Sequence, residues 1–208
     1  MYSKRILVGL TGQTGAGKTV VSDYLQQKGY QVINADAVAR EVVAKGSRCL
    51  SDLVLAFGVD ILQADGTLNR RKLGDIVFAD SGKRKTLNRI TFPYIQEEIF
   101  SRVEQLQQGG ADILFLDAPT LFESGSHKRC DRIVSVIAPP DIRLMRILRR
   151  DGITEEQAKA RMAAQHQDEY YTSRSHHIIV NDGSLQNLYA QVDRVLDELK
   201  KLVTGEDS

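Results

Sequence analysis

The stretch that decides the fold is Gly12-Gln13-Thr14-Gly15-Ala16-Gly17-Lys18-Thr19. It fits the phosphate-binding pattern G-x-x-x-x-G-K-S/T at every fixed position. An apolar run over residues 6–10 precedes it and is typical of a buried strand, and residues 20–27 follow with apolar side chains on one helical face. Because strand, loop and helix agree, a P-loop is favoured over a glycine-rich turn that merely joins two elements.

The residue types of this loop suit a nucleoside triphosphate. Glycines let the backbone fold tightly around an anion, so that its N–H groups and the following helix N-terminus point at phosphate oxygens. Lys18 is expected to reach the β- and γ-phosphates, and the Thr19 hydroxyl is expected to ligate Mg²⁺. We therefore predict that the eight loop residues and Val20 bind the nucleotide.

Bulk composition is that of an ordinary globular protein. The 208 residues suit one α/β domain with inserted substructures, and the net charge of +1 gives no case for nucleic-acid or membrane binding. Cys49 and Cys130 form no metal-type pair and fit a reduced compartment. No apolar run is long enough for a signal peptide or a membrane span. We expect a cytoplasmic protein that is a monomer or a weak homo-oligomer.

Strand-like apolar runs alternate with helical patterns along the chain. The strands are expected at residues 6–10, 31–35, 112–116, 133–137 and 177–180. This alternation predicts an α/β P-loop kinase fold, in which helices cover both faces of a parallel β-sheet. The core of a single kinase domain is expected at about 1–36, 110–140 and 175–203, with the helical stretch 185–202 packed on the sheet.

Two insertions interrupt the core. Residues 37–109 lack strands and carry three helical patterns, which predict an acceptor-binding helical insertion; the first should end at Gly58, the second should begin near Asn69, and the third spans Ile95 to Leu106. Residues 141–170 should form a short helical lid. Its first helix ends at Asp151-Gly152, and a capping box of Thr154 and Gln157 begins the next.

Asp36 and Arg40 follow the second strand, at the edge where open α/β sheets bind ligands. The Asp36 carboxylate could accept the proton of a hydroxyl that attacks the γ-phosphate, or it could cap the helix that begins near Ala37. Arg40 lies one turn later on the same side. It could hold a phosphate or carboxylate of the acceptor, or it could be solvated.

Asp117 and a row of arginines are further candidates. Asp117 ends an apolar strand, a Walker-B-like position that orients Mg²⁺ and its waters. Arg143, Arg146 and Arg150 recur at i, i+3 and i+7, so they share one face of the first lid helix. They could clamp a triphosphate, or they could form a solvated stripe. The four histidines lack metal-ligand spacing and are expected to be structural or solvated.

Taken together, these residues resemble the dephospho-CoA kinase family over about residues 6–195. The motifs that carry the resemblance are the P-loop, Asn34-Ala35-Asp36 with Arg40, Gly66 to Phe78, Leu87 to Ile95, Asp117 to Glu123, Arg146 to Gln165, and Asn181-Asp182-Gly183. This family transfers the γ-phosphate of ATP to the ribose 3′-hydroxyl of dephospho-CoA, the last step of CoA synthesis. The resemblance thus implies ATP and Mg²⁺ as cofactors and dephospho-CoA as the substrate.

The resemblance also implies roles for single residues. Asp36 becomes the general base, Arg40, Arg70 and Asp117 contact the substrate, Arg146 and Arg150 join Lys18 at the ATP phosphates, and Asn181 and Gly183 lie beside adenine. Several positions depart from the family pattern: Asn34 replaces an aspartate, Phe92 a histidine and Thr120 a leucine, and Ser175-His176-His177 replaces Ala-Asp and an apolar residue. Another small-molecule kinase for a nucleotide or nucleoside, or an ATP-binding regulatory protein without turnover, is the alternative.

Overall fold

The computed structural model describes residues 4–205, and its strands alternate with helices as expected. The strands are β1 (Ile6–Gly12), β2 (Gln31–Asn34), β3 (Ile113–Asp117), β4 (Arg132–Ile137) and β5 (His177–Val180). The α-helices are α1 (Lys18–Gln27), α2 (Ala35–Glu41), α3 (Arg48–Phe57), α4 (Arg70–Ala79), α5 (Ser81–Gln108), α6 (Pro140–Asp151), α7 (Glu155–Ala163), α8 (Asp168–Thr172) and α9 (Leu185–Thr204). Two short 3₁₀ helices are η1 (Val59–Ile61) and η2 (Ser126–Arg129).

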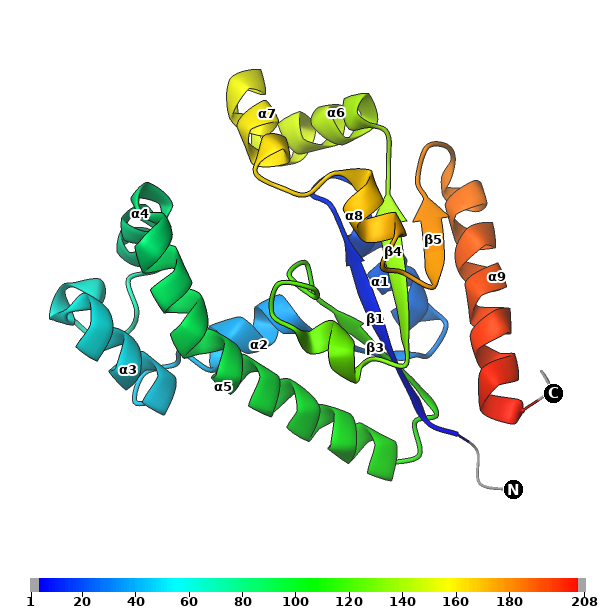
Figure 1. Cartoon of the computed structure of the whole chain (residues 1–208), viewed down its shortest axis with the longest axis horizontal. Coiled ribbons are helices and arrows are strands. Elements are labelled where there is room, and N and C mark those ends of the chain that lie inside the picture. Colours follow the sequence, from blue (N-terminus) through cyan, green and yellow to red (C-terminus); the bar gives the residue numbers. More distant parts are fainter. Residues whose placement is uncertain (1–3, 206–208) are drawn as a thin grey trace. The chain divides into compact units, whose positions relative to one another are not determined.

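The strands form one sheet in the order β2-β3-β1-β4-β5 (Figure 1). β1 runs parallel to both of its neighbours, β3 and β4, and β4 runs parallel to β5. Every residue of β1 and β3 is buried, as expected for central strands of a sheet that is covered on both faces. The predicted α/β fold with a parallel sheet is therefore confirmed.

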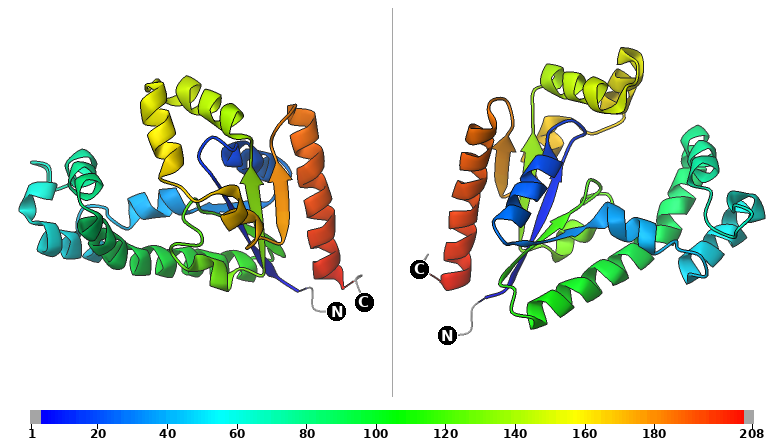
Figure 2. Two further views of the ribbon diagram at one scale, coloured as in Figure 1. Left: turned by 45° about the horizontal axis from the view of Figure 1, so that its top comes forward. Right: turned by 180° about the vertical axis from the view of Figure 1, so that it is seen from behind.

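Helices α1 and α9 lie side by side on one face of this sheet (Figure 2). Their apolar stripes pack with the strand side chains in one core, to which α9 contributes Leu188, Val192, Leu196 and Leu199. On the opposite face, α8 contacts β4, and the methyl groups of Leu121 and the thiol of Cys130 lie against Gly9 of β1. The prediction that the C-terminal helix packs on the sheet is confirmed.

The chain divides into two compact units. The sheet unit comprises the described residues up to Ile33 and from Gln105 onward, and the helical unit comprises Asn34–Glu104. The helical unit has its own apolar core, built from Val43, Cys49, Leu50, Leu53, Ile61, Leu68 and Leu73. Cys49 is therefore part of the core of the helical unit, whereas Cys130 is half-buried in the sheet unit.

Helix ends follow the sequence signals closely, with one exception. Gly58 ends α3, Asn69 caps α4 through a hydrogen bond from Lys72 N, and the Thr154 capping box is formed. The exception is α5, which the sequence predicted from residue 95 and which begins at Ser81 and continues through Pro93. Proline costs about 3 kcal/mol inside a helix, so the buried side chains along α5 outweigh its local preference.

No α-helix within residues 4–205 is both long enough and apolar enough to cross a membrane.

Candidate active site

The P-loop follows β1 directly and wraps the N-terminus of α1. Gly15 and Gly17 have φ angles of 78° and 97°, a region that favours glycine. Both are also closely packed: a Cβ at Gly17 would lie 2.1 Å from Asn181 Nδ2, and a Cβ at Gly15 would lie 2.7 Å from the Arg143 carbonyl oxygen. These two glycines are therefore required by backbone conformation and by space.

Lys18 and Asp117 form an ion pair at the carboxyl end of the sheet. Lys18 is the first residue of α1, and Asp117 is the last residue of β3, where its side chain is only 3% exposed. The adjacent strands bring them together, because Leu10 of β1 is in register with Asp117. Thr19 follows at the same helix N-terminus. An ammonium group, a carboxylate and a hydroxyl therefore gather where a P-loop holds Mg²⁺ and phosphate.

No group of three or more His, Cys, Asp or Glu side chains is placed to hold a metal anywhere in the described part of the chain. This does not count against Mg²⁺ at Thr19 and Asp117. Mg²⁺ usually keeps several waters and is bound through one or two protein oxygens together with substrate phosphates. The donor set present, one hydroxyl and one carboxylate, fits that mode of binding.

Arg146 and Asn181 contact the backbone of the P-loop. Arg146 Nη1 donates to the carbonyl oxygens of Gly15 and Ala16, each at 3.3 Å, and Asn181 Nδ2 donates to that of Ala16 at 2.8 Å. Arg146 Nη2 also donates to Asn181 Oδ1 at 3.0 Å. The structure therefore brings together these two residues, which the sequence predicted to lie on the phosphate and adenine sides. Gly183 lies exposed in the turn before α9.

The three arginines of α6 that were predicted to share one face do not act alike. Arg143 is 4% exposed and donates from Nε to the Thr14 carbonyl oxygen at 3.0 Å, and its burial lowers the pKa of the guanidinium. Arg150 is engaged by Asp151, with an Nε–Oδ1 distance of 2.7 Å, and Arg161 contacts the same carboxylate at 2.7 Å. The ion pair raises the pKa of Arg150. The predicted common face is thus divided between the P-loop and the far end of α6.

Three candidate acceptor residues lie in the helical unit. Asp36 is the second residue of α2, and its side chain is exposed. The interpretation of Asp36 as the helix cap is wrong, because Asn34 Oδ1 accepts the Ala37 N–H at 2.9 Å and caps α2. Arg70 opens α4, and its Nη2 donates to the Arg40 carbonyl oxygen at 3.0 Å. The beginning of α4 is thereby attached to α2, one turn beyond Asp36.

Arg70 also lines two cavities within the helical unit. The first, about 230 Å³, is mostly apolar and is lined by Ala39, Val43, Leu53, Leu68, Arg70, Leu73, Gly74, Val77, Leu87, Thr91 and Ile95. The second, about 590 Å³, is more polar and is lined by Val43, Ala44, Lys45, Gln63, Thr67, Leu68, Asn69, Arg70 and Arg71. A cationic side chain shared by an apolar and a polar cavity suits a ligand that has an anionic and an apolar part.

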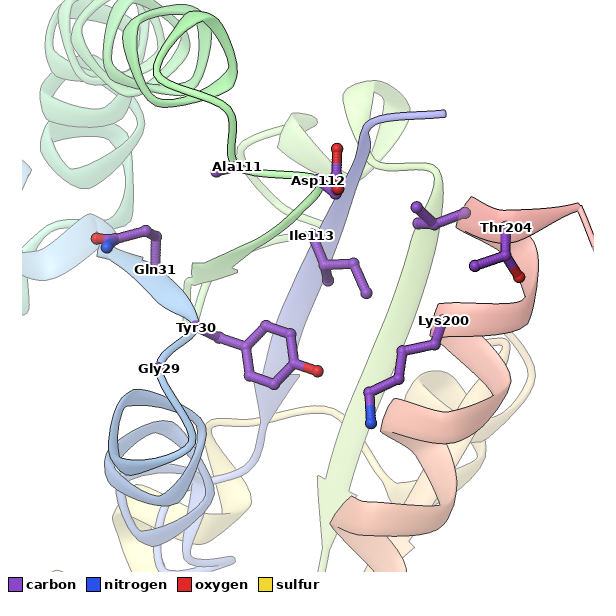
Figure 3. Close-up of a pocket in the computed structure, with 9 residues that line it drawn as sticks. Gly29, Tyr30, Gln31, Ala111, Asp112, Ile113, Lys200 and Thr204 are labelled. Atoms are coloured by element: carbon purple, nitrogen blue, oxygen red, sulfur yellow. The ribbon is translucent and has the colours of Figure 1, made fainter. Parts of the chain in front are cut away.

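A further cavity of about 330 Å³ lies in the sheet unit, at the opposite end of the strands from the P-loop (Figure 3). It is lined by residues that begin β2 and β3, Gln31 and Ile113, and by Tyr30 and Lys200, whose side chains reach towards each other. Ligands of open α/β sheets bind at the carboxyl ends of the strands. This cavity is therefore not the phosphate site.

The sequence did not predict the contacts that two residues make with the P-loop. The sequence singled out Arg143 only as one of three arginines on a helical face, and Gln165 only as the last residue of a motif. In the structure, Gln165 Oε1 accepts the Thr14 N–H at 2.8 Å. Helix spacing identifies a shared face but not which member is buried. No local signal predicts that a glutamine 151 positions away will contact the loop.

Comparisons with known proteins agree with this geometry. A family model described as dephospho-CoA kinase matches residues 6–187. A dephospho-CoA kinase of Listeria innocua is 40% identical over 185 residues, which cover 89% of this chain and 92% of that protein. One of Arabidopsis thaliana is 39% identical over 95% of this chain and 85% of its own. A crystal structure of a Thermus thermophilus protein is 32% identical with a TM-score of 0.79, covering 94% and 98% of the two chains.

Proposed function

Because the chain belongs to the dephospho-CoA kinase family, we propose that it transfers the γ-phosphate of ATP to the ribose 3′-hydroxyl of dephospho-CoA, giving CoA and ADP. The observation that carries the proposal is the P-loop, whose Lys18 is paired with Asp117 at the carboxyl end of the sheet. A kinase needs this combination of phosphate cradle, cation and Mg²⁺-orienting carboxylate.

ATP is the ligand of the sheet unit in this proposal. The P-loop, residues 12–19 with Val20, receives the phosphates through backbone N–H groups such as those of Gly15 and Gly17, and Lys18 neutralises charge on the β- and γ-phosphates. Arg146 adds charge from α6, and Arg150 joins it when Asp151 releases its guanidinium. Thr19 and Asp117 hold Mg²⁺, which supplies charge neutralisation at the β- and γ-phosphates when it is bound. Asn181 and Gly183 lie on the adenine side.

Dephospho-CoA is the ligand of the helical unit. Arg40 and Arg70 contact its anionic part. In support, the positively charged side chain of Arg70 lines both cavities of this unit. Asp36 is the general base, and the capping of α2 by Asn34 supports this role, since it leaves the Asp36 carboxylate exposed and available. The 3′-oxygen attacks the γ-phosphorus, the bond to the β-phosphate oxygen breaks, and Asp36 takes the hydroxyl proton.

One direct assay tests the proposed reaction. The purified chain is mixed with Mg-ATP and dephospho-CoA, and the products are analysed by mass. We expect CoA and ADP in equal amounts, and no CoA when EDTA removes Mg²⁺. Adenosine and AMP serve as competing acceptors. ADP release with one of them, but not with dephospho-CoA, would overturn the acceptor, and tight ATP binding without turnover on any acceptor would favour a regulatory role.

The proposal extends to the setting of the protein. Both cysteines are free thiols, which suits the reducing cytoplasm. We propose a monomer or weak homo-oligomer, which gel filtration at several protein concentrations tests directly.

A further inference from the structure

Thr14 of the P-loop is held on both sides by side chains of the lid segment. Arg143 of α6 donates from Nε to the Thr14 carbonyl oxygen at 3.0 Å, and Gln165, which follows α7, accepts the Thr14 N–H at 2.8 Å. The two lid side chains also meet, with 3.5 Å between Arg143 Nη2 and Gln165 Oε1. Both peptide groups that flank Thr14 are therefore fixed, one from the start of the lid and one from its end.

Two more contacts strengthen this attachment. Gln13 Nε2 donates to the His166 carbonyl oxygen at 2.9 Å, and Gln13 is only 4% exposed. The backbone of Arg143 fills the space beside Gly15, where a Cβ would lie 2.7 Å from the Arg143 carbonyl oxygen. The turn Gln13–Thr14 is thus enclosed by lid residues. We call these contacts of Gln13 and Thr14 with Arg143, Gln165 and His166 the clasp.

The clasp bears on phosphate binding through the geometry of the peptide bond. In a trans peptide, the C=O and the following N–H point in opposite directions. Arg143 holds the Thr14 carbonyl oxygen, so it directs the Gly15 N–H away from α6. Arg146 and Asn181 do the same for the Ala16 carbonyl oxygen and the Gly17 N–H. Side chains on the outside of the loop therefore aim backbone donors at its inside, where an anion would sit.

Stability alone does not account for a buried arginine at this place. Within the described part of the chain, the ion pair of Arg143 is with Asp168, whose Oδ1 lies 3.9 Å from Nη1 and whose side chain is about half exposed. Incomplete pairing makes burial of a cation costly, and an apolar side chain of similar volume is often as stable or more so. Arg143 therefore carries a cost in folding that a role in ordering the P-loop would explain.

We propose that Arg143 and Gln165 are positioning residues that preorganise the P-loop for the ATP phosphates and connect it to the lid. The proposal rests on the proposed binding of ATP by this loop. Neither residue is assigned a contact with ATP. Removal of either side chain is expected to reduce the free energy of ATP binding by more than it reduces the free energy of unfolding.

The experiment measures the affinity of Arg143→Met, Gln165→Met and the double variant for a non-hydrolysable ATP analogue with Mg²⁺, by calorimetry. Each single variant should raise the Kd by about tenfold or more, as expected for loss of a hydrogen bond that orders the loop. The Kd of the double variant should be little higher than that of the weaker-binding single variant, because both side chains hold the same residue, Thr14. Gln165→Glu keeps the acceptor oxygen and should stay closer to wild type than Gln165→Met.

The control is Arg149→Met, which removes the same charge from the exposed side of α6. It should leave the Kd near the wild-type value. Two further measurements complete the test: thermal unfolding without nucleotide, and the KM for each substrate. If the role of Arg143 and Gln165 were merely structural, their loss would lower the melting temperature without a selective rise in the KM for ATP. If Arg143→Met fails to fold, the comparison of Gln165→Met with Gln165→Glu decides.

Two outcomes would overturn the clasp as a positioning device. In the first, Arg143→Met and Gln165→Met bind the analogue as tightly as wild type; in the second, Arg149→Met loses as much affinity as Arg143→Met. Failure of the proposed ATP binding is a different result, because the wild-type chain would then not bind the analogue at all, and a chain that binds the analogue without turning over any acceptor leaves this test intact.

Discussion

Asp36 and Lys18 belong to different units, so their proposed roles can be separated by substitution. Asp36 stands exposed on the first turn of α2, while Lys18 stands at the first turn of α1 and pairs with the buried Asp117. The first residue is proposed to act on the acceptor hydroxyl and the second on the ATP phosphates. Loss of the first should affect chemistry, and loss of the second should affect both ATP use and folding.

We expect Asp36→Asn to lower kcat by about 100-fold or more, since general-base catalysis contributes on the order of 10²–10⁴. The KM for ATP should stay near wild type. Asp75→Asn, an exposed carboxylate of α4, is the matched control and should keep its turnover. Steady-state kinetics over both substrates check the prediction, and near-normal turnover of Asp36→Asn would remove Asp36 as the base.

We expect Lys18→Met to abolish efficient use of ATP and to lower the free energy of unfolding by about 3 kcal/mol, because the buried Asp117 carboxylate loses its cation. Adding Asp117→Asn should restore much of the stability without restoring ATP use. Denaturant unfolding and ATP titration of the single and double variants measure the two effects. Unchanged stability in Lys18→Met would show that the ion pair contributes nothing to folding.

At the level of elements, the sequence predicted the sheet better than the surroundings of the site. All five strands and the ends of α3, α4 and α6 follow from apolar runs and cap residues, because these signals are local. The short α8 and the first half of α5 were missed. Five residues give little periodicity, and a proline inside a helix contradicts its local pattern.

The contacts of α6 and of the rest of the predicted lid could not be predicted for a different reason. The spacing of Arg143, Arg146 and Arg150 was read correctly as one helical face, yet burial divides them. Which arginine is buried depends on how α6 packs over the P-loop, and that is a long-range property. The sequence likewise left the cap role of Asp36 open, and the hydrogen bond of Asn34 excludes that role, while the role of Asp36 as the base stays a prediction.

β5 provides a pH-sensitive element through His177. Burial lowers the pKa of this imidazole against a smaller opposing effect of Glu198, and Nδ1 lies 3.1 Å from Glu198 Oε2. Nε2 is buried with no hydrogen-bond partner among residues 4–205. The folded state therefore favours the neutral ring, whereas the unfolded chain takes up a proton near pH 6.5.

It follows that the free energy of unfolding should fall as the pH decreases from about 7 through the lowered pKa of His177. The slope for one such group is at most about 1.4 kcal/mol per pH unit between its unfolded and folded pKa values. Denaturant unfolding between pH 7.5 and 5 checks this, with His177→Gln as the comparison. The same slope in both proteins would show that His177 is not responsible.

For the molecule as a whole, ATP should act as a stabilising ligand of the sheet unit. At a free Mg-ATP concentration of 100 times Kd, binding adds about 2.7 kcal/mol to the free energy of unfolding. The melting temperature should therefore rise with Mg-ATP, and EDTA should cancel most of the rise if Mg²⁺ is held with the phosphates. An equal rise with and without EDTA would argue against a metal at Thr19 and Asp117.

The two cysteines provide a reporter of motion that needs no engineering. Cys49 lies in the core of the helical unit, and Cys130 lies under β1 in the sheet unit; burial raises their thiol pKa values to about 11 and about 12. Alkylating reagents attack the thiolate, so both sulfurs should react slowly, and faster when their own surroundings open. The labelling rate of Cys49 therefore reports local opening of the helical unit, and the labelling rate of Cys130 reports local opening of the sheet unit independently.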